Sequence, residues 1–410
     1  MSDEPEFVSS CVDLADSRLG SSVLFCTDEW FARAENLLNP APPSFDPTTF
    51  CSQGKVMDGW ESRRRRLPGH DWCVIKLALP GCIHGVELDT AYFTGNYVPR
   101  FSIQAANLPP SKCSSSSWLV NADARAAKEG GTQGTCETPE DIATADKQLS
   151  DAGTWTTLVP MTPLRRGDPA TSRQFFSVPP SSRLRRATHL RLNYFPDGGV
   201  ARLRVYGLVV RDFATELAAS TDKDAELSSV LLGGRGLTQS NKHYGVPTNM
   251  LRKNRGVDMG DGWETARYLD RPPIIKTDPT TGLVDSTSND WCVLRMACVV
   301  TDITKLALET THFKGNFPES ARVDYCCVPE GKLNVSDAAS VDQIPWKPFL
   351  KRTKLAADAT FVYEKGDLEE HGDVTHLRLF MYPDGGVSRV RLFGKAKAPI
   401  LDDDEPAARL

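Results

Sequence analysis

Acidic and imidazole side chains recur beside loop motifs in both halves of the sequence, and they are the candidates for proton transfer. Glu61 and Glu264 each follow an Asp-Gly-Trp tripeptide. His70 precedes Asp71 in the first half, and His312 belongs to the second half. Such groups act as general acid or general base in many reactions. The catalytic candidates are therefore Glu61, His70, Asp71, Glu264 and His312, and the sequence leaves open which half works.

A second set of paired polar residues suits the binding of a polar ligand. One arginine in each half follows the Trp-Glu pair and offers a planar donor fork for a carboxylate. One carboxylate in each half can accept hydrogen bonds from N–H groups. One asparagine in each half follows a glycine, where it can equally serve a turn. The substrate-binding candidates are Arg64, Asp89, Asn96, Arg267, Glu309 and Asn316.

Known cofactor and metal motifs are missing from the sequence. It has no G-x-G-x-x-G after a strand, no P-loop, no H-E-x-x-H and no G-x-S-x-G. We therefore expect no cofactor and assign no metal ligands. The available Asp, Glu and His side chains leave a divalent metal open, although no ligand spacing demands one.

The segments that must position these residues occur twice in the sequence. Thr188–Gly207 recurs as Thr375–Gly394, offset by 187 (375 − 188), with 13 of 20 positions identical. Leucines and valines alternate with arginines on both sides of Pro-Asp-Gly-Gly, the period-2 pattern of half-buried strands around a turn. Each copy is therefore predicted to form an antiparallel hairpin with its arginines on the polar face.

Three further blocks repeat in the same order, so the chain is predicted to hold two similar domains. Asp-Gly-Trp-Glu, Asp-Trp-Cys-Val and Gly-Asn occur once in each half. Short strands, many turn residues and little helical periodicity favour an all-β sandwich for each half. Residues 107–153 are predicted to be a surface insertion. The predicted boundaries are an N-terminal tail at 1–18, repeats at 19–210 and 231–397, a linker at 211–230 and an acidic tail at 398–410.

Charge and termini limit the partners. The net charge is −5 over 410 residues, with a pI near 5.9, so no overall positive field attracts nucleic acid or an anionic membrane. No signal peptide or membrane-spanning run is evident. Eleven cysteines without a paired framework fit reduced thiols. The last residues, Ala408-Arg409-Leu410, resemble a peroxisomal address, with a cytoplasmic location as the alternative.

The motifs together resemble those of the allantoicase family. The segments that carry the resemblance are Gly-Lys-Val-Met-Asp-Gly-Trp-Glu-Ser-Arg (54–63), Pro-Gly-His-Asp-Trp-Cys-Val (68–74), Tyr-Phe-Thr-Gly-Asn-Tyr (92–97) and the two Pro-Asp-Gly-Gly blocks. The resemblance implies a tandem of jelly-roll β-sandwiches, similar to galactose-binding domains, that assembles as a homo-oligomer. It also implies hydrolysis of the small molecule allantoate to ureidoglycolate and urea in purine breakdown.

The resemblance supplies no residue-level mechanism, so the candidate residues above come from the sequence pattern alone. On allantoate, an arginine would bind the carboxylate, and acidic side chains would face the ureido N–H groups. The alternative function is a non-catalytic tandem sandwich that binds a ligand or a carbohydrate, because this architecture hosts many binders.

Overall fold

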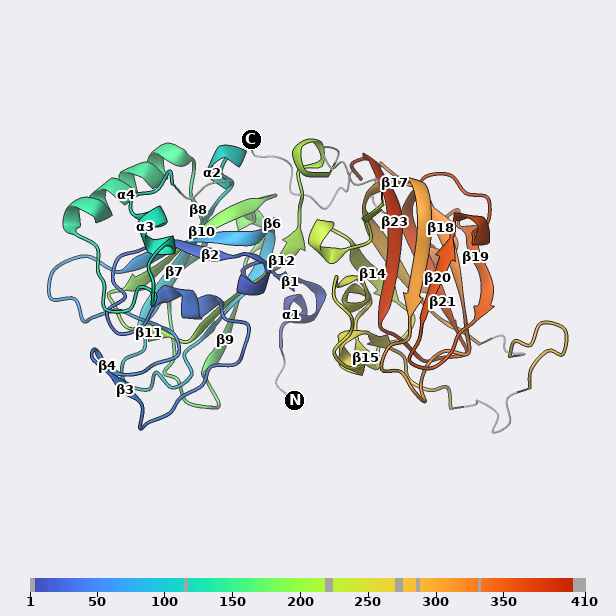
Figure 1. Ribbon diagram of the computed structural model, residues 1–410, viewed down its shortest axis with the longest axis horizontal. Coiled ribbons are helices and arrows are strands. Elements are labelled where there is room, and N and C mark those ends of the chain that lie inside the picture. Colours follow the sequence, from blue (N-terminus) through green and yellow to red (C-terminus); the bar gives the residue numbers. More distant parts are fainter. Residues whose placement is uncertain are drawn as a thin grey trace. The chain divides into compact units, whose positions relative to one another are not determined.

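The structure is a computed structural model that describes residues 4–113, 117–217, 224–269, 276–284, 288–330 and 333–400. The chain divides into two compact units, the first ending at Val210 and the second beginning at Arg211. Figure 1 draws the first unit in blue to green and the second in yellow to red. Antiparallel strands dominate both units, so the predicted all-β tandem repeat is confirmed.

The first unit is organised around one long strand, β6 (Trp72–Asp89). Its other strands are β1 (Val12–Asp13), β2 (Ser22–Cys26), β3 (Phe50–Cys51), β4 (Gly54–Lys55), β5 (Trp60–Glu61), β7 (Arg100–Ala106), β8 (Thr156–Pro163), β9 (Arg173–Ser177), β10 (Ala187–Phe195), β11 (Gly199–Val200) and β12 (Arg202–Val209). Its helices are α1 (Glu6–Ser10), α2 (Pro110–Cys113), α3 (Ala122–Ala126) and α4 (Pro139–Ala152).

Strand β6 changes its neighbours at Pro80-Gly81 and so belongs to both layers of the sandwich. Its first part pairs with β2 and β10, and its second part pairs with β12 and β9. Apolar residues such as Val74, Ile75, Val86 and Leu88 are fully buried along it. Burial on both faces explains why this strand reads as a nearly continuous apolar run.

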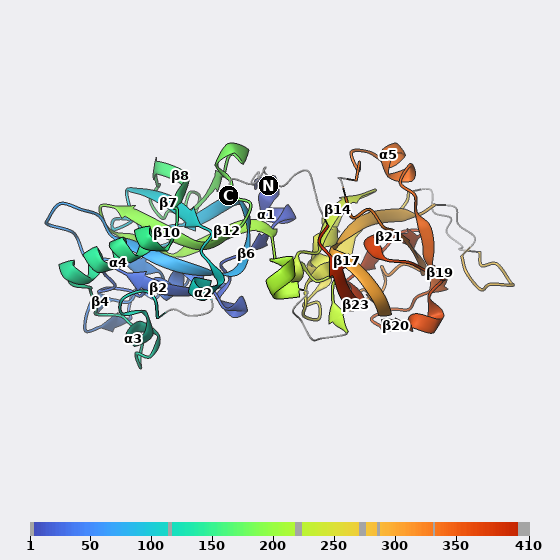
Figure 2. The same cartoon turned by 90° about the horizontal axis from the view of Figure 1, so that it is seen from above.

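The second unit repeats this topology around β17 (Asp290–Glu309). The strand order β13-β23-β17-β21-β18-β19 matches β1-β12-β6-β10-β7-β8 of the first unit position by position. Figure 2 shows β17 with its neighbours β21 and β23. Its other elements are β13 (Ala225–Glu226), β14 (Arg235–Gln239), β15 (Tyr244–Gly245), β16 (Trp263–Glu264), β18 (Ser320–Cys326), α5 (Ala338–Asp342), β19 (Lys347–Lys354), β20 (Thr360–Glu364), β21 (Val374–Tyr382), β22 (Gly386–Val387) and β23 (Arg389–Ala398).

The predicted hairpin is wrong in both units. β10 and β12 lie on opposite sides of β6 and do not pair with each other, and β21 and β23 flank β17 in the same way. Pro-Asp-Gly-Gly therefore links β10, which ends opposite Trp72, to β12, which begins opposite Asp89, with a cis peptide at Phe195-Pro196 and a φ of 129° at Gly198. The sequence pattern indicated strands and a turn correctly, but a period of two does not reveal which strand lies beside which.

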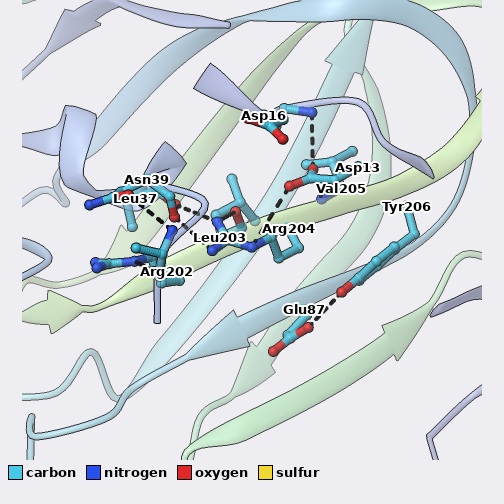
Figure 3. A network of polar contacts seen from close by, with 12 residues as sticks. Asp13, Asp16, Leu37, Asn39, Glu87, Arg202, Leu203, Arg204, Val205 and Tyr206 are labelled. Carbon is cyan, nitrogen blue, oxygen red and sulfur yellow. Dashed lines mark hydrogen bonds and ion pairs between the residues drawn. The ribbon is translucent and has the colours of Figure 1, made fainter. Parts of the chain in front are cut away.

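The arginines after this turn are also placed differently from the prediction. Arg202 is only 2% exposed and Arg389 only 1%, although both alternate with apolar residues. Arg202 donates to the Asp58 carboxylate at 2.7 Å, and Arg389 donates to Asp261 at 2.6 Å. In Figure 3, Arg202 and Arg204 both point toward the loop around Leu37 and Asn39. Arg202 and Arg389 therefore each link the strand that follows the turn to a loop of the same repeat, through an ion pair with an aspartate.

The predicted tail and linker differ from the described structure. Within 1–18, α1 and β1 are ordered parts of the first unit, since β1 pairs with β12 and Leu14 is fully buried. Within 211–230, β13 pairs with β23, so the second sheet begins before residue 231. Ala408-Arg409-Leu410 lies outside the described residues. None of the described helices is long and apolar enough to cross a membrane.

The insertion at 107–153, predicted to be a surface insertion, forms helices that pack on the first unit. Leu119, Ala122 and Leu149 are buried against Phe25 and Trp72. Ala122 on α3 and Ala145 and Leu149 on α4 supply this face, and Thr138 caps α4 by accepting from the Asp141 N–H at 3.1 Å. The insertion thus adds a second core over β2 and β6 (Figure 1).

Candidate active site

Two of the repeated motifs meet in a short antiparallel pair. β5 carries Trp60 and Glu61, and it pairs with β11 so that Gly199 faces Glu61. A Cβ atom on Gly199 would come within 2.1 Å of the Phe93 ring, so no larger residue fits there without movement. Trp60 is fully buried and stacks on Tyr194 with ring centroids 3.9 Å apart. Close packing therefore fixes the backbone that presents Glu61.

The third motif, Gly-Asn, joins the same site through Asn96. The Asn96 carbonyl accepts from the Gly199 N–H at 2.8 Å. Its side-chain Nδ2 donates to Glu61 Oε1 at 2.6 Å. One residue thereby holds both the turn glycine and the carboxylate. The structure thus brings together two candidates, Glu61 and Asn96, that lie far apart in the sequence.

Glu61 and Asn96 line a cavity of about 790 Å³ in the first unit. Burial raises the pKa of Glu61, and the hydrogen bond from Asn96 opposes that rise. A carboxyl group of raised pKa in a cavity is suited to hold and donate a proton. The lining residues are Phe31, Pro43, Phe45, Lys55, Met57, Glu61, Ala91, Tyr92, Thr94, Asn96, Gly167, Pro169 and Ser172.

Tyr92 has an unusual backbone at the edge of this cavity. Its φ is 69°, and His312 at the matching place of the second repeat has a φ of 71°. A bulky residue in the left-handed region is strained and persists only where its surroundings hold it. The Tyr92 ring stacks on Phe45 with centroids 5.5 Å apart. The strained turn thus places an aromatic pair in the lining of the cavity that also contains Glu61.

The second repeat preserves the central contact with different surroundings. Asn316 Nδ2 donates to Glu264 Oε1 at 2.6 Å and also lies 3.5 Å from Met259 Sδ. His312 Nε2 lies 2.8 Å from the Gly256 carbonyl oxygen. His312 is thus engaged by backbone, whereas the equivalent Tyr92 lines an open cavity.

His70 and Asp71 lie elsewhere in the first unit. His70 Nε2 lies 3.2 Å from Asn193 Oδ1, its ring packs on Phe195, and burial lowers its pKa. The Asp71 carboxylate accepts from Thr27 and from Arg65, and burial raises its pKa. Neither residue lines the cavity with Glu61. Asp71 therefore joins three chain segments in the structure.

The remaining binding candidates fall into two groups. Asp89 accepts from the Ala91 N–H at 2.8 Å, and Glu309 accepts from Arg391 at 2.7 Å, so both carboxylates already have partners. Arg64 and Arg267 are exposed, and Arg64 does not line the cavity. Of the six binding candidates, only Asn96 does.

Lys55, Phe45 and Tyr92 line the cavity but were not among the predicted site residues. Our candidates were residues that recur in both halves or that differ at matched positions. Lys55 lies two residues before Met57, the first residue of the repeated block Met-Asp-Gly-Trp-Glu, in which the second half carries an extra residue. Its position near that block was the feature of the sequence that could have indicated a place in the site. Among the described residues, no group of three His, Cys, Asp or Glu side chains could hold a metal ion.

Comparisons with known proteins agree on one family. The model of the allantoicase repeat matches residues 12–210 and 225–397. A probable allantoicase of Burkholderia mallei is 37% identical over 391 residues, covering 95% of this chain and 96% of that protein. One of Stutzerimonas stutzeri is 36% identical over 384 residues, covering 94% and 96%. The crystal structure of allantoicase from Saccharomyces cerevisiae is 30% identical, covers 96% of this chain and 98% of its own, and has a TM-score of 0.57.

Proposed function

The chain belongs to the allantoicase family, and from this premise we propose that it hydrolyses allantoate to ureidoglycolate and urea. The observation that carries the site assignment is Glu61, a buried carboxyl group of raised pKa that faces a cavity and is oriented by Asn96. The first repeat is therefore the proposed working site. The alternative, a non-catalytic carbohydrate-binding sandwich, has no comparable observation in its favour.

The chemistry follows from the bond that must break. Urea leaves when the bond between the central carbon of allantoate and one ureido nitrogen is cleaved. We assign to protonated Glu61 the transfer of its proton to that nitrogen, while the lone pair of the second ureido nitrogen stabilises the carbon left behind. Water then adds to the carbon and returns a proton to the Glu61 carboxylate. The products are ureidoglycolate and urea, and Glu61 ends in its starting state.

The fold supports this step by holding the acid before the substrate arrives. Trp60 is locked by stacking, Gly199 is locked by Phe93, and Asn96 fixes one carboxyl oxygen. The Glu61 carboxyl group is thus oriented by its neighbours before the substrate binds. Such preorganisation reduces the entropy lost at the transition state.

The experiment is a direct assay of urea release from allantoate by the full chain. Urea and ureidoglycolate in equal amounts are expected. Absence of urea, with the protein folded and with divalent cations both supplied and chelated in separate reactions, would overturn the enzyme assignment. Binding of sugars to the same inactive protein would favour the alternative.

We also propose a peroxisomal location, on the strength of the C-terminal Ala408-Arg409-Leu410. The test compares fluorescent fusions of the full chain and of a chain lacking Leu410. Loss of peroxisomal signal on deletion is expected, and an unchanged cytoplasmic signal for both would contradict the proposal.

A further inference from the structure

One positive charge lines the cavity that holds Glu61. Among the described residues of the lining, Lys55 alone is basic and Glu61 alone is acidic. We propose that Lys55 receives the carboxylate of the substrate. The inference rests on the proposed function, since it concerns how the same cavity orients allantoate, and it replaces the arginine that the sequence suggested for this role.

A small hairpin presents the Lys55 ammonium group. β3 and β4 pair so that Phe50 faces Lys55, and Gly54 makes the tight turn with a φ of 128°. The Nζ atom lies 5.5 Å from the ring centroid of Phe45 and 5.7 Å from that of Phe50. Cation–π attraction to two rings restrains a flexible side chain without neutralising its charge.

The insertion at 107–153 supports this hairpin. Gln133 donates to the Phe31 carbonyl at 2.8 Å and lies 3.2 Å from Cys51 Sγ. Phe31 itself lines the cavity. The hairpin that carries Lys55 is therefore attached to the wall of the cavity, and its ammonium group is presented from a supported position.

No carboxylate of the described residues neutralises Lys55. In the described ranges, no carboxylate lies within ion-pair distance of its Nζ atom, whereas Arg63, Arg65 and Arg202 each pair with an aspartate. A lysine ammonium is a compact charge that exchanges its water for an anionic ligand. A ligand with a carboxylate at one end and a departing ureido group at the other matches a cavity with one cation and one proton donor.

Arg64 is the competing residue for the carboxylate. Arg64 and Lys55 are both exposed, but only Lys55 lines the cavity. A side chain outside the lining is not placed to contact a ligand bound in the cavity, so Arg64 is the weaker candidate for the substrate carboxylate. The geometry therefore favours Lys55 over Arg64.

The test measures steady-state kinetics of Lys55→Met and Lys55→Arg with allantoate. Lys55→Met is expected to raise KM on the order of tenfold, with kcat changed by less than about threefold, because a charge-assisted contact is lost in both ground and transition states. Lys55→Arg should restore most of the loss. Lys112→Met is the matched control, since Lys112 also lies over an aromatic ring, 5.0 Å from the Trp118 centroid, but outside the cavity.

A second experiment uses a substrate analogue to distinguish loss of carboxylate binding from a general structural effect of the Lys55 substitution. The carboxamide analogue of allantoate should inhibit the wild type weakly, and Lys55→Met should bind the amide and the acid alike. Raising the salt concentration should raise KM for the wild type more than for Lys55→Met.

An unchanged KM in Lys55→Met, or a rise confined to Arg64→Met, would overturn the inference while the enzyme stays active. Loss of urea release in the wild type would instead remove the proposed function. Circular dichroism of each variant shows whether it is folded. If Lys55→Met does not fold, the KM of Lys55→Arg still tests the inference.

Discussion

Asn96 donates its side-chain N–H to Glu61 at 2.6 Å, and the second repeat reproduces the contact between Asn316 and Glu264 at the same distance. The contact stabilises the ionised carboxylate, whereas burial favours the protonated acid. The proton affinity of Glu61 is thus set by two opposing causes that mutation can separate.

The first prediction concerns this balance. Asn96→Ala removes a bond to the charged form, so the pKa of Glu61 rises further and the acid stays protonated to higher pH. The basic limb of the kcat/KM profile is expected to move to higher pH, with kcat lowered by looser orientation of Glu61. A basic limb that stays in place would show that Glu61 is not the titrating acid.

The second prediction compares the matched glutamates. Glu61→Gln keeps the bond from Asn96 but cannot donate a carboxyl proton, so kcat should fall by roughly 10²–10⁴-fold. Glu264→Gln is the matched comparison, measured in the same assay. A rate loss in Glu264→Gln as large as that in Glu61→Gln would move the chemistry to the second repeat.

The third prediction tests the packing beneath Glu61. Gly199→Ala places a methyl group 2.1 Å from the Phe93 ring and should lower the free energy of unfolding by about 1–3 kcal/mol. Gly95→Ala is the control, because nothing lies within 4 Å of the added atom. Urea denaturation measures both, and equal stability of the two variants would contradict the tight contact.

The fourth prediction is a loss of stability in acid. Burial lowers the pKa of His189 from 6.5 to about 4, and that of His376 to about 3. The unfolded chain therefore binds protons at these histidines before the folded chain does, so stability is full above pH 6.5 and declines as pH falls toward 4. Each histidine contributes roughly 3 kcal/mol to this decline.

Urea denaturation between pH 7 and pH 5 measures this decline. His189→Gln keeps a polar group near Thr188, whose Oγ1 lies 2.9 Å from His189 Nδ1, but does not titrate. Its stability should depend less steeply on pH than that of the wild type. An equal slope would mean that His189 is protonated in the folded protein.

The fifth prediction concerns the insertion. Arg125 on α3 pairs with Glu29 and Glu35 and donates to the Val23 carbonyl at 3.1 Å. Its side chain is 7% exposed, and that of Glu29 is 2% exposed. Arg125→Met leaves a buried carboxylate unpaired and should cost about 3–5 kcal/mol of unfolding free energy.

The exposed pair between Arg166 and Asp168 provides the control for Arg125. Arg166→Met should cost less than about 1 kcal/mol, because both side chains face solvent. Thermal or urea unfolding of the two variants gives the comparison. Similar small losses for both would mean that the insertion is held mainly by apolar packing.

The sequence predicted the repeat and the all-β class because identity and period-2 alternation are local signals. It also singled out Glu61 and Asn96, since both recur. The pairing of β10 with β6 instead of β12 depends on contacts between distant segments, which alternation cannot show. Arg202 was misplaced because a pattern treats every arginine as polar surface, whereas burial beside Asp58 requires the loop in place. Lys55 was not predicted as a site residue, because it does not belong to a block that recurs in both halves.

The shared strand has a consequence for how each repeat comes apart. In β6, hydrogen bonds to β2 and β10 are followed directly by hydrogen bonds to β9 and β12 along one continuous backbone. Separating either layer from this strand exposes apolar side chains of the other, such as Val74 or Val86. Partial opening of a single layer is therefore costly, and each repeat behaves as one cooperative unfolding unit in spite of its two sheets.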